Sequence, residues 1–159
     1  MGKGTAVQGI DAKTMSVLKK FIQMAIVLSF LILIMKLNWK IRGPEAMRRL
    51  NKIEGELGEI RPFPNALLMS KNPSVKPETG VLDATYLVQG APSTSVERWY
   101  KEEFGRLNWS PVSVESHQSK RLLRFCRNGE TAILILPDDS SGAKTEFQIE
   151  IGWGSSYGC

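Results

Sequence analysis

Residues that could carry out chemistry are scarce in this sequence. The 159 residues include one histidine, His117, and two cysteines, Cys126 and Cys159. A lone histidine is more often a surface residue than a catalytic base or a ligand. The cysteines are far apart and lack the CxxC or Cys/His spacing of a zinc or redox site. The sequence therefore predicts no metal centre, and it leaves open whether either cysteine is oxidised.

The short motifs of nucleotide-binding and hydrolytic enzymes are also missing. The sequence contains no Gly-x-Gly-x-x-Gly, no Walker loop and no Gly-x-Ser-x-Gly. Glycines do gather at residues 152–158, but a phosphate cradle needs the N-terminus of a following helix. Asp138 and Asp139 lie in a predicted turn that lacks the alternating oxygen ligands of a calcium loop. We therefore expect a non-catalytic protein without a cofactor.

Positive charge is concentrated in one part of the chain. The formal net charge is +5, with ten Lys/Arg against five Asp/Glu in residues 1–59 and eleven of each in residues 60–159. A basic balance of this kind can attract nucleic acid or anionic lipid headgroups. Because the excess flanks an apolar segment, we predict membrane lipid as a partner and no nucleic acid.

That apolar segment runs from Phe21 to Met35 and continues to Trp39. Its only polar side chains before Lys36 are Gln23 and Ser29. With Lys36 reaching toward the headgroups, the segment approaches the ~20 residues that cross the hydrocarbon core of a bilayer. Aromatic residues such as Trp39 are typical of the membrane interface. The residues predicted to lie in the span include Phe21, Ile26, Leu28, Phe30, Leu31, Leu33 and Trp39.

A cleavable signal or a buried helix would account less well for the apolar segment. A cleaved secretory signal has a shorter apolar core and a small-residue cleavage site, whereas this core leads into residues 36–42, which are mostly polar and basic. A buried helix of a soluble domain would have to be surrounded on all sides. Lys19 and Lys20 directly before the segment favour a signal anchor with a cytoplasmic N-terminus, although the basic residues after it oppose this orientation.

The pattern divides the chain into a mobile tail at 1–16, a transmembrane helix at 17–40 and a juxtamembrane amphipathic helix at 43–60. Gly43 and Pro44 are predicted to separate the two helices. The second helix carries an apolar stripe formed by Met47, Leu50, Ile53, Leu57 and Ile60. The stripe can pack on the folded domain, lie among lipid headgroups or pair with a partner helix.

Residues 61–159 are predicted to form an α+β domain. We expect a short edge strand at 66–70, a loop at 71–80, and a strand at Val81–Gln89. A helix follows, opened by a capping box of Thr94 with Glu97 and closed by Asn108 in a left-handed conformation. Alternating residues predict a strand at 112–115. Asn128-Gly129 predicts a tight hairpin that pairs residues 122–127 with 130–136, and a last strand covers 146–153. This β-α-β-β-β-β order predicts one antiparallel sheet with a helix on one face.

One helix cannot cover both faces of that sheet. Leu122, Ile133 and Ile135 are apolar residues on the face opposite the helix. Either the segment 66–88 or a partner has to cover them. The candidate partner interface therefore comprises Leu50, Ile53 and Leu57 of the juxtamembrane stripe together with Leu122, Ile133 and Ile135.

Four stretches carry a resemblance to known proteins. They are Pro62-Phe63-Pro64, a predicted strand that ends near Tyr86, the helical stretch 95–109 that ends in Trp109, and Glu150-Ile-Gly-Trp153. In these stretches the chain resembles small membrane-anchored bacterial envelope proteins, most of them uncharacterised. The resemblance implies an α+β module and carries no catalytic residue. We expect the protein in the bacterial inner membrane.

Two functional hypotheses follow. In the first, the protein is an accessory or assembly subunit of a larger membrane complex and uses its α+β domain, on the periplasmic side, as an interaction module. The cytoplasmic face is the alternative location of that domain. In the second, the domain is a sensor that binds a solute or lipid in a pocket between helix and sheet, beneath Trp99 and Trp109.

Overall fold

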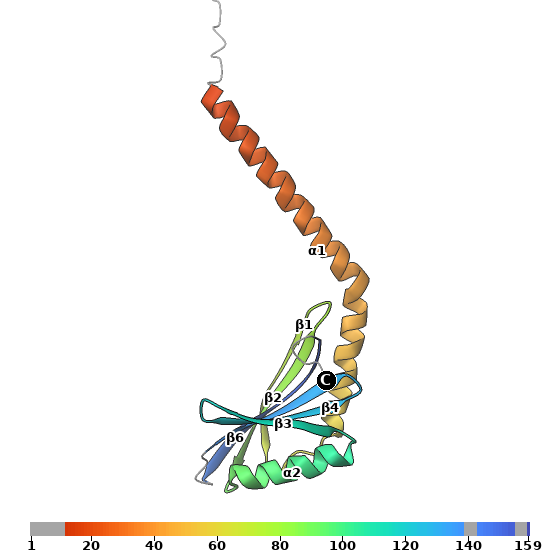
Figure 1. The fold of residues 1–159 in the computed structure, drawn as a ribbon, viewed down its shortest axis with the longest axis vertical. Coiled ribbons are helices and arrows are strands. Elements are labelled where there is room, and N and C mark those ends of the chain that lie inside the picture. The colour runs from red at the N-terminus through yellow and green to blue at the C-terminus, as the bar shows by residue number, and fades with distance from the viewer. Residues whose placement is uncertain (1–11, 139–142, 155–158) are drawn as a thin grey trace, which may run out of the picture. The chain divides into compact units, whose positions relative to one another are not determined.

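The computed structural model describes residues 12–138, 143–154 and 159, arranged in two compact units, 1–41 and 42–159. Its elements are the helices α1 (Ala12–Glu59) and α2 (Ser93–Arg106) and six strands. The strands are β1 (Leu67–Val75), β2 (Gly80–Gln89), β3 (Ser110–His117), β4 (Lys120–Arg127), β5 (Glu130–Pro137) and β6 (Lys144–Trp153). Figure 1 shows the helices and the sheet. The predicted α+β class is confirmed.

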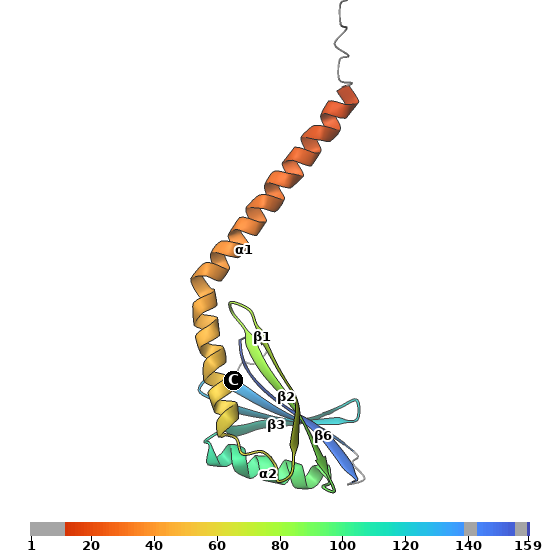
Figure 2. The ribbon, with the colours of Figure 1, turned by 180° about the vertical axis from the view of Figure 1, so that it is seen from behind.

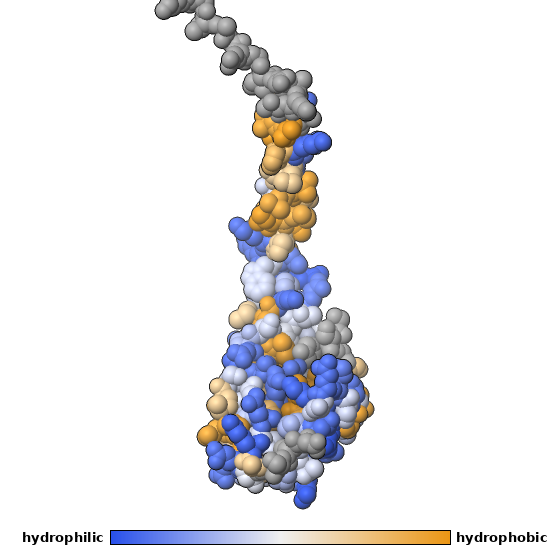
Figure 3. All heavy atoms as spheres, turned by 90° about the vertical axis from the view of Figure 1, so that its left-hand side faces the viewer, coloured by the Kyte–Doolittle hydropathy of each residue, from blue (hydrophilic) through white to orange (hydrophobic). Residues whose placement is uncertain are grey.

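The first unit is the apolar part of α1. Its large side chains are exposed, with Phe21 at 61 %, Phe30 at 62 % and Trp39 at 47 % of their accessible surface. Figure 3 shows hydrophobic residues gathered along this part of the helix. α1 is long and apolar enough to cross a membrane by length and composition, and it is the one such helix among the described residues.

The predicted break at Gly43-Pro44 is wrong. α1 continues from Ala12 to Glu59 with Pro44 inside it. A proline removes one backbone hydrogen bond and crowds the preceding turn, at a cost of ~3 kcal/mol. The turns that follow Pro44 are fixed by the burial of Ala46, Leu50 and Ile53 in the core of the second unit. This burial offsets the local penalty, so the helix is not interrupted.

The second unit is built on one antiparallel sheet with the strand order β1-β2-β6-β5-β4-β3. The predicted loop at 71–80 is wrong for its first half, because β1 extends to Val75 and pairs with β2. Pro73 lies within β1, where a proline is tolerated because an edge strand has a neighbour on one side only. The sheet therefore has six full strands, whereas the sequence predicted five strands and a short edge segment.

The hairpin between β4 and β5 has the predicted register. Arg127 pairs with Glu130, and the positive φ angles of Asn128 (52°) and Gly129 (77°) suit the two-residue turn. Asn108, with φ of 62°, follows α2 as predicted. The predicted capping box is wrong, because α2 starts at Ser93 with Pro92 as its N-cap and no side-chain cap bond. The predicted turn 138–142 lies mostly outside the described residues.

Two helical segments cover the same face of the sheet, which we call the inner face. They are α2 and the part of α1 after Arg42, whose apolar stripe enters the core (Figures 1 and 2). Its buried members are Ala46, Leu50, Ile53, Leu57 and Ile60. Met47, predicted for this stripe, is instead 44 % exposed. Ion pairs from Lys52 to Glu130 of β5 and from Glu54 to Lys71 of β1, both 2.7 Å, join α1 to the sheet.

A glycine in β2 makes room for the last tryptophan of the sheet. The Trp153 ring lies so close to Gly80 that a Cβ atom added there would be 2.1 Å from the ring. Gly80 and Trp153 are register partners on β2 and β6, and Trp153 is buried. Only glycine fits this position without displacing the ring.

Gly80→Val should therefore destabilise the domain by about 1–3 kcal/mol, because the added side chain overpacks the core. Gly105→Ala is the matched control: it lies in α2 with nothing within 4 Å of the added atom, and alanine should stabilise the helix by about 0.5–1 kcal/mol. Unfolding of the detergent-solubilised chain, followed by tryptophan fluorescence, measures both changes. A Gly80→Val protein as stable as the parent would contradict the packing described here.

Candidate functional site

Half of the predicted interface residues lie inside the domain. Leu50, Ile53 and Leu57 are buried in the core between α1 and the sheet, with Ile53 fully inaccessible. Of the three arrangements considered for the juxtamembrane stripe, packing on the domain is the one observed. The chain itself therefore covers these three residues.

The other half lies on the opposite side of the sheet, which we call the outer face. Leu122 pairs with Ile135, and Ile133 is the neighbour of Arg124 in the same ladder. Ile133 is 7 % exposed, while Leu122 and Ile135 are half-buried. The segment 66–88 does not cover this face, as one alternative proposed, because it forms β1 and β2 of the same sheet.

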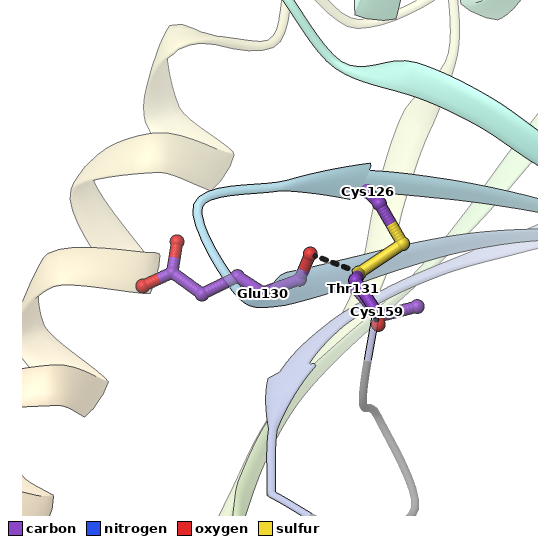
Figure 4. The surroundings of a disulfide bond; sticks show 4 residues. All are labelled: Cys126, Glu130, Thr131 and Cys159. Atoms are coloured by element: carbon purple, nitrogen blue, oxygen red, sulfur yellow. Dashed lines mark hydrogen bonds between the residues drawn. A yellow bond between two sulfur atoms is a disulfide. The ribbon is translucent and has the colours of Figure 1, made fainter.

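A disulfide bond lies at the hairpin end of the outer face. Cys126 of β4 is bonded to Cys159, with the Cα atoms 5.8 Å apart (Figure 4). The Thr131 hydroxyl is 3.2 Å and the Glu130 carbonyl oxygen 3.0 Å from Cys159 Sγ. An even number of cysteines allows a disulfide bond, but the sequence does not show whether Cys126 and Cys159 lie close enough to form one.

On the inner side of the same hairpin lies a pair of acidic residues, Glu56 and Glu130, which we call the carboxylate pair. Lys52 Nζ lies 2.7 Å from Glu130 Oε1 and 3.4 Å from Glu56 Oε1. Arg127 Nη2 lies 2.9 Å from Glu56 Oε1. The second oxygen of each carboxylate is buried and has no hydrogen-bond partner among the described residues. Two acids and two bases thus meet where α1 crosses the hairpin.

Burial has the largest effect on the pKa of Glu130. Burial raises the pKa of Glu130, the Lys52 hydrogen bond opposes the rise, and the neighbouring Glu56 carboxylate adds to it. The hydrogen bond to Glu130 raises the pKa of Lys52. This site was not predicted from the sequence. Lys52 and Glu56 are four residues apart on a helix, but their meeting with Glu130 depends on a long-range contact that no local pattern reveals.

A second acidic residue has the opposite electrostatics. Glu103 of α2 is buried between two guanidinium groups, with Arg106 Nη2 at 2.5 Å and Arg61 Nη2 at 2.6 Å from its oxygens. Hydrogen bonds from Arg106 and then Arg61 hold the pKa of Glu103 far below its usual range. Arg106 also donates to the backbone carbonyl of Glu59 at 3.0 Å. This cluster joins α2 to the end of α1.

Aromatic rings fill the space beneath the two tryptophans of the sensor hypothesis. Phe104 stacks on Phe125 with the ring centroids 4.5 Å apart and meets Trp109 edge-on at 6.0 Å. Trp109 is 2 % exposed, and the Arg127 guanidinium lies 4.6 Å from its ring centroid. These aromatic residues belong to the core. Their helical and strand spacing in the sequence also favours core positions over a pocket.

Both edges of the sheet carry exposed apolar residues. On β1, Leu67, Leu68 and Met69 are 63 %, 53 % and 58 % exposed. On β3, Val112 and Val114 are 58 % and 60 % exposed. Each of these strands has one hydrogen-bonded neighbour in the sheet. An edge strand of this kind presents unpaired backbone groups together with apolar side chains.

Comparison with protein-family models, with curated proteins and with solved structures finds no match to this chain. The resemblance to membrane-anchored envelope proteins therefore stays a prediction. Within the described ranges 12–138 and 143–154, with residue 159, no three His, Cys, Asp or Glu residues are grouped so that they could hold a metal ion.

Glu130→Gln tests the carboxylate pair through the pH dependence of stability. The pKa of Glu130 is higher in the folded state than its ordinary value of 4.5. The folded state therefore disfavours the ionised carboxylate, and Glu130 lowers the free energy of unfolding as pH rises from 4.5 through the raised pKa. The variant should therefore gain in melting temperature relative to the parent as pH rises from 4 to 8.

Glu103→Gln is the matched control with the opposite sign. The lowered pKa of Glu103 contributes stability above its ordinary value, and that contribution is lost as pH falls. This variant should be less stable by about 1–3 kcal/mol at pH 7, and its deficit should shrink toward acid. Thermal melts of the full chain in detergent measure both. A Glu130→Gln melting profile that stays parallel to the parent would contradict the raised pKa of Glu130.

Proposed function

We propose that this protein is a single-pass, membrane-anchored accessory or assembly subunit of a larger membrane protein complex. α1 anchors the chain in the bacterial inner membrane, as a signal anchor, and the α+β domain is a non-catalytic interaction module on the periplasmic side. The observation that carries this proposal is the exposure of apolar residues at both edges of the sheet.

The apolar part of α1 supports the membrane location. A run of exposed side chains such as Phe21, Leu28 and Phe30 is unfavourable in water, at roughly 25 cal/mol for each Å² of apolar surface. Lipid removes that cost without a protein partner. Gln23 and Ser29 are the exceptions in this run, and polar side chains inside a bilayer often contribute to helix–helix contacts.

The disulfide supports the periplasmic location of the domain. Disulfides persist in oxidising compartments such as the bacterial periplasm and are rare in the cytosol. The Cys126–Cys159 bond agrees with the orientation favoured by Lys19 and Lys20 before the apolar segment. This argument is independent of the basic residues on the two sides of the apolar segment, which favour opposite orientations.

The edges of the sheet support the interaction role. Each edge strand contains a proline, Pro73 in β1 and Pro111 in β3, and prolines on edge strands discourage uncontrolled strand pairing. The apolar residues Leu67, Leu68 and Met69 lie at the start of β1, away from Pro73. This combination leaves a short segment to which an extended segment of a partner can add as a further strand.

Site-specific photo-crosslinking in membranes tests the proposal. A photoreactive amino acid is placed at Leu68 on β1, at Val114 on β3 and, as control, at Glu102 on the exposed side of α2. The edge positions should crosslink to one membrane protein that also co-purifies with the parent chain in native mass spectrometry of a mild detergent extract. Glu102 should not crosslink to it.

Leu68→Lys should reduce that co-purification, because a charge opposes the apolar contact, and the domain should keep its melting temperature because Leu68 is exposed. Crosslinks that form equally from Glu102, or none from either edge, would contradict the interaction role. Release of the chain from membranes by alkaline carbonate would contradict the anchor.

A further inference from the structure

Two central strands of the sheet separate before they end. The ladder between β5 and β6 stops at the pair Ile135 with Gln148. β5 nevertheless stays paired with β4 as far as Pro137 with Lys120, and β6 stays paired with β2 as far as Lys144 with Gln89. The sheet therefore divides into two branches, and the β3–β4 hairpin diverges from β2 and β6 (Figures 1 and 2).

A cleft of about 350 Å³ lies between the two branches. One wall is apolar and is formed by Ile135 and Pro137 of β5. Phe147 of β6 also lines the cleft, although its ring belongs to the core and stacks on Tyr86 at 5.3 Å. Phe147 is 2 % exposed, so its ring stays in the core and the apolar surface of the cleft comes from Ile135 and Pro137.

The other lining residues are polar, and two of them are lysines from opposite branches. Lys120 comes from β4 and Lys144 from β6, and both are exposed. Among the lining residues that the structure describes, Glu146 is the one acidic residue, so these residues together have an excess of one positive charge. Thr85 and Gln148 complete it with a hydroxyl and an amide.

We propose that this cleft binds a small organic carboxylate, with the carboxylate between Lys120 and Lys144 and an apolar group against Ile135 and Pro137. The volume lies at the lower end of the ~300–1,000 Å³ found for small-molecule sites, which suits a compact ligand. The combination of apolar lining and a few convergent polar groups is typical of such sites. This site is distinct from the edges that carry the proposed interaction, and it needs no partner protein.

Benzoate is a suitable probe because benzamide has the same shape without the charge. The full chain, labelled at isoleucine methyl groups and held in a neutral maltoside detergent, is titrated with each compound. The Ile135 methyl resonance, assigned with Ile135→Val, should shift and saturate with benzoate. Benzamide should bind more weakly, because a neutral amide forms no ion pair with the lysines.

The double variant Lys120→Gln/Lys144→Gln should bind benzoate about tenfold more weakly, which corresponds to about 1.4 kcal/mol. Lys76→Gln is the matched control, because Lys76 is an exposed lysine in the turn between β1 and β2 and outside the cleft. It should leave the affinity unchanged. Melting temperatures of both variants should equal that of the parent, since the replaced side chains are exposed.

Three results would overturn the proposal. They are an Ile135 resonance that does not saturate with benzoate, equal affinity for benzamide, and parental affinity in the double variant. None of these results bears on crosslinking at the sheet edges, so the failure of the cleft and the failure of the proposed interaction are separable.

Discussion

The burial of the α1 stripe against the inner face of the sheet is the interaction on which the second unit depends. Ala46, Leu50, Ile53, Leu57 and Ile60 are all buried there. Each fully buried Leu or Ile is worth roughly 1.5–3 kcal/mol, whereas a whole domain is stable by only about 5–15 kcal/mol. The stripe thus contributes an amount comparable to the net stability. The helix that contains the long apolar segment therefore also contributes to the domain's core.

The charged contacts determine how this helix is held. Glu54 meets Lys71 on β1, while Lys52 and Glu56 meet Glu130 and Arg127 at the β4–β5 hairpin. The same hairpin carries the disulfide on its outer side. Residues 130 and 131 point to opposite faces because side chains alternate along a strand. Glu130 therefore connects the hairpin to α1, and the neighbouring Thr131 contacts Cys159.

Local signals were sufficient for much of the fold. Asn128-Gly129 defines its hairpin because few residues adopt two successive positive φ angles, and the apolar spacing of Val96, Tyr100 and Phe104 identifies the buried side of α2. β1 was missed beyond Ser70 because Lys71, Asn72 and Pro73 disfavour a strand locally. Its pairing with β2 supplies the hydrogen bonds that make it one.

The site could be predicted less well than the fold, because its parts are distant in the sequence. The stripe of α1 was identified, but an apolar helical face has the same pattern whether it meets its own sheet, lipid or a partner. The carboxylate pair joins residues 56 and 130, and the disulfide joins 126 and 159. The cleft depends on where the β5–β6 ladder stops, which side-chain alternation does not determine.

The role of α1 in the core is tested most directly by comparing two soluble fragments, residues 42–159 and residues 61–159, produced under oxidising conditions. Fragment 42–159 retains the stripe and should unfold in one cooperative transition. Fragment 61–159 lacks the stripe and should show no cooperative transition, because the inner face of its sheet would be exposed. A fragment 61–159 that melts cooperatively at the same temperature as fragment 42–159 would contradict the account.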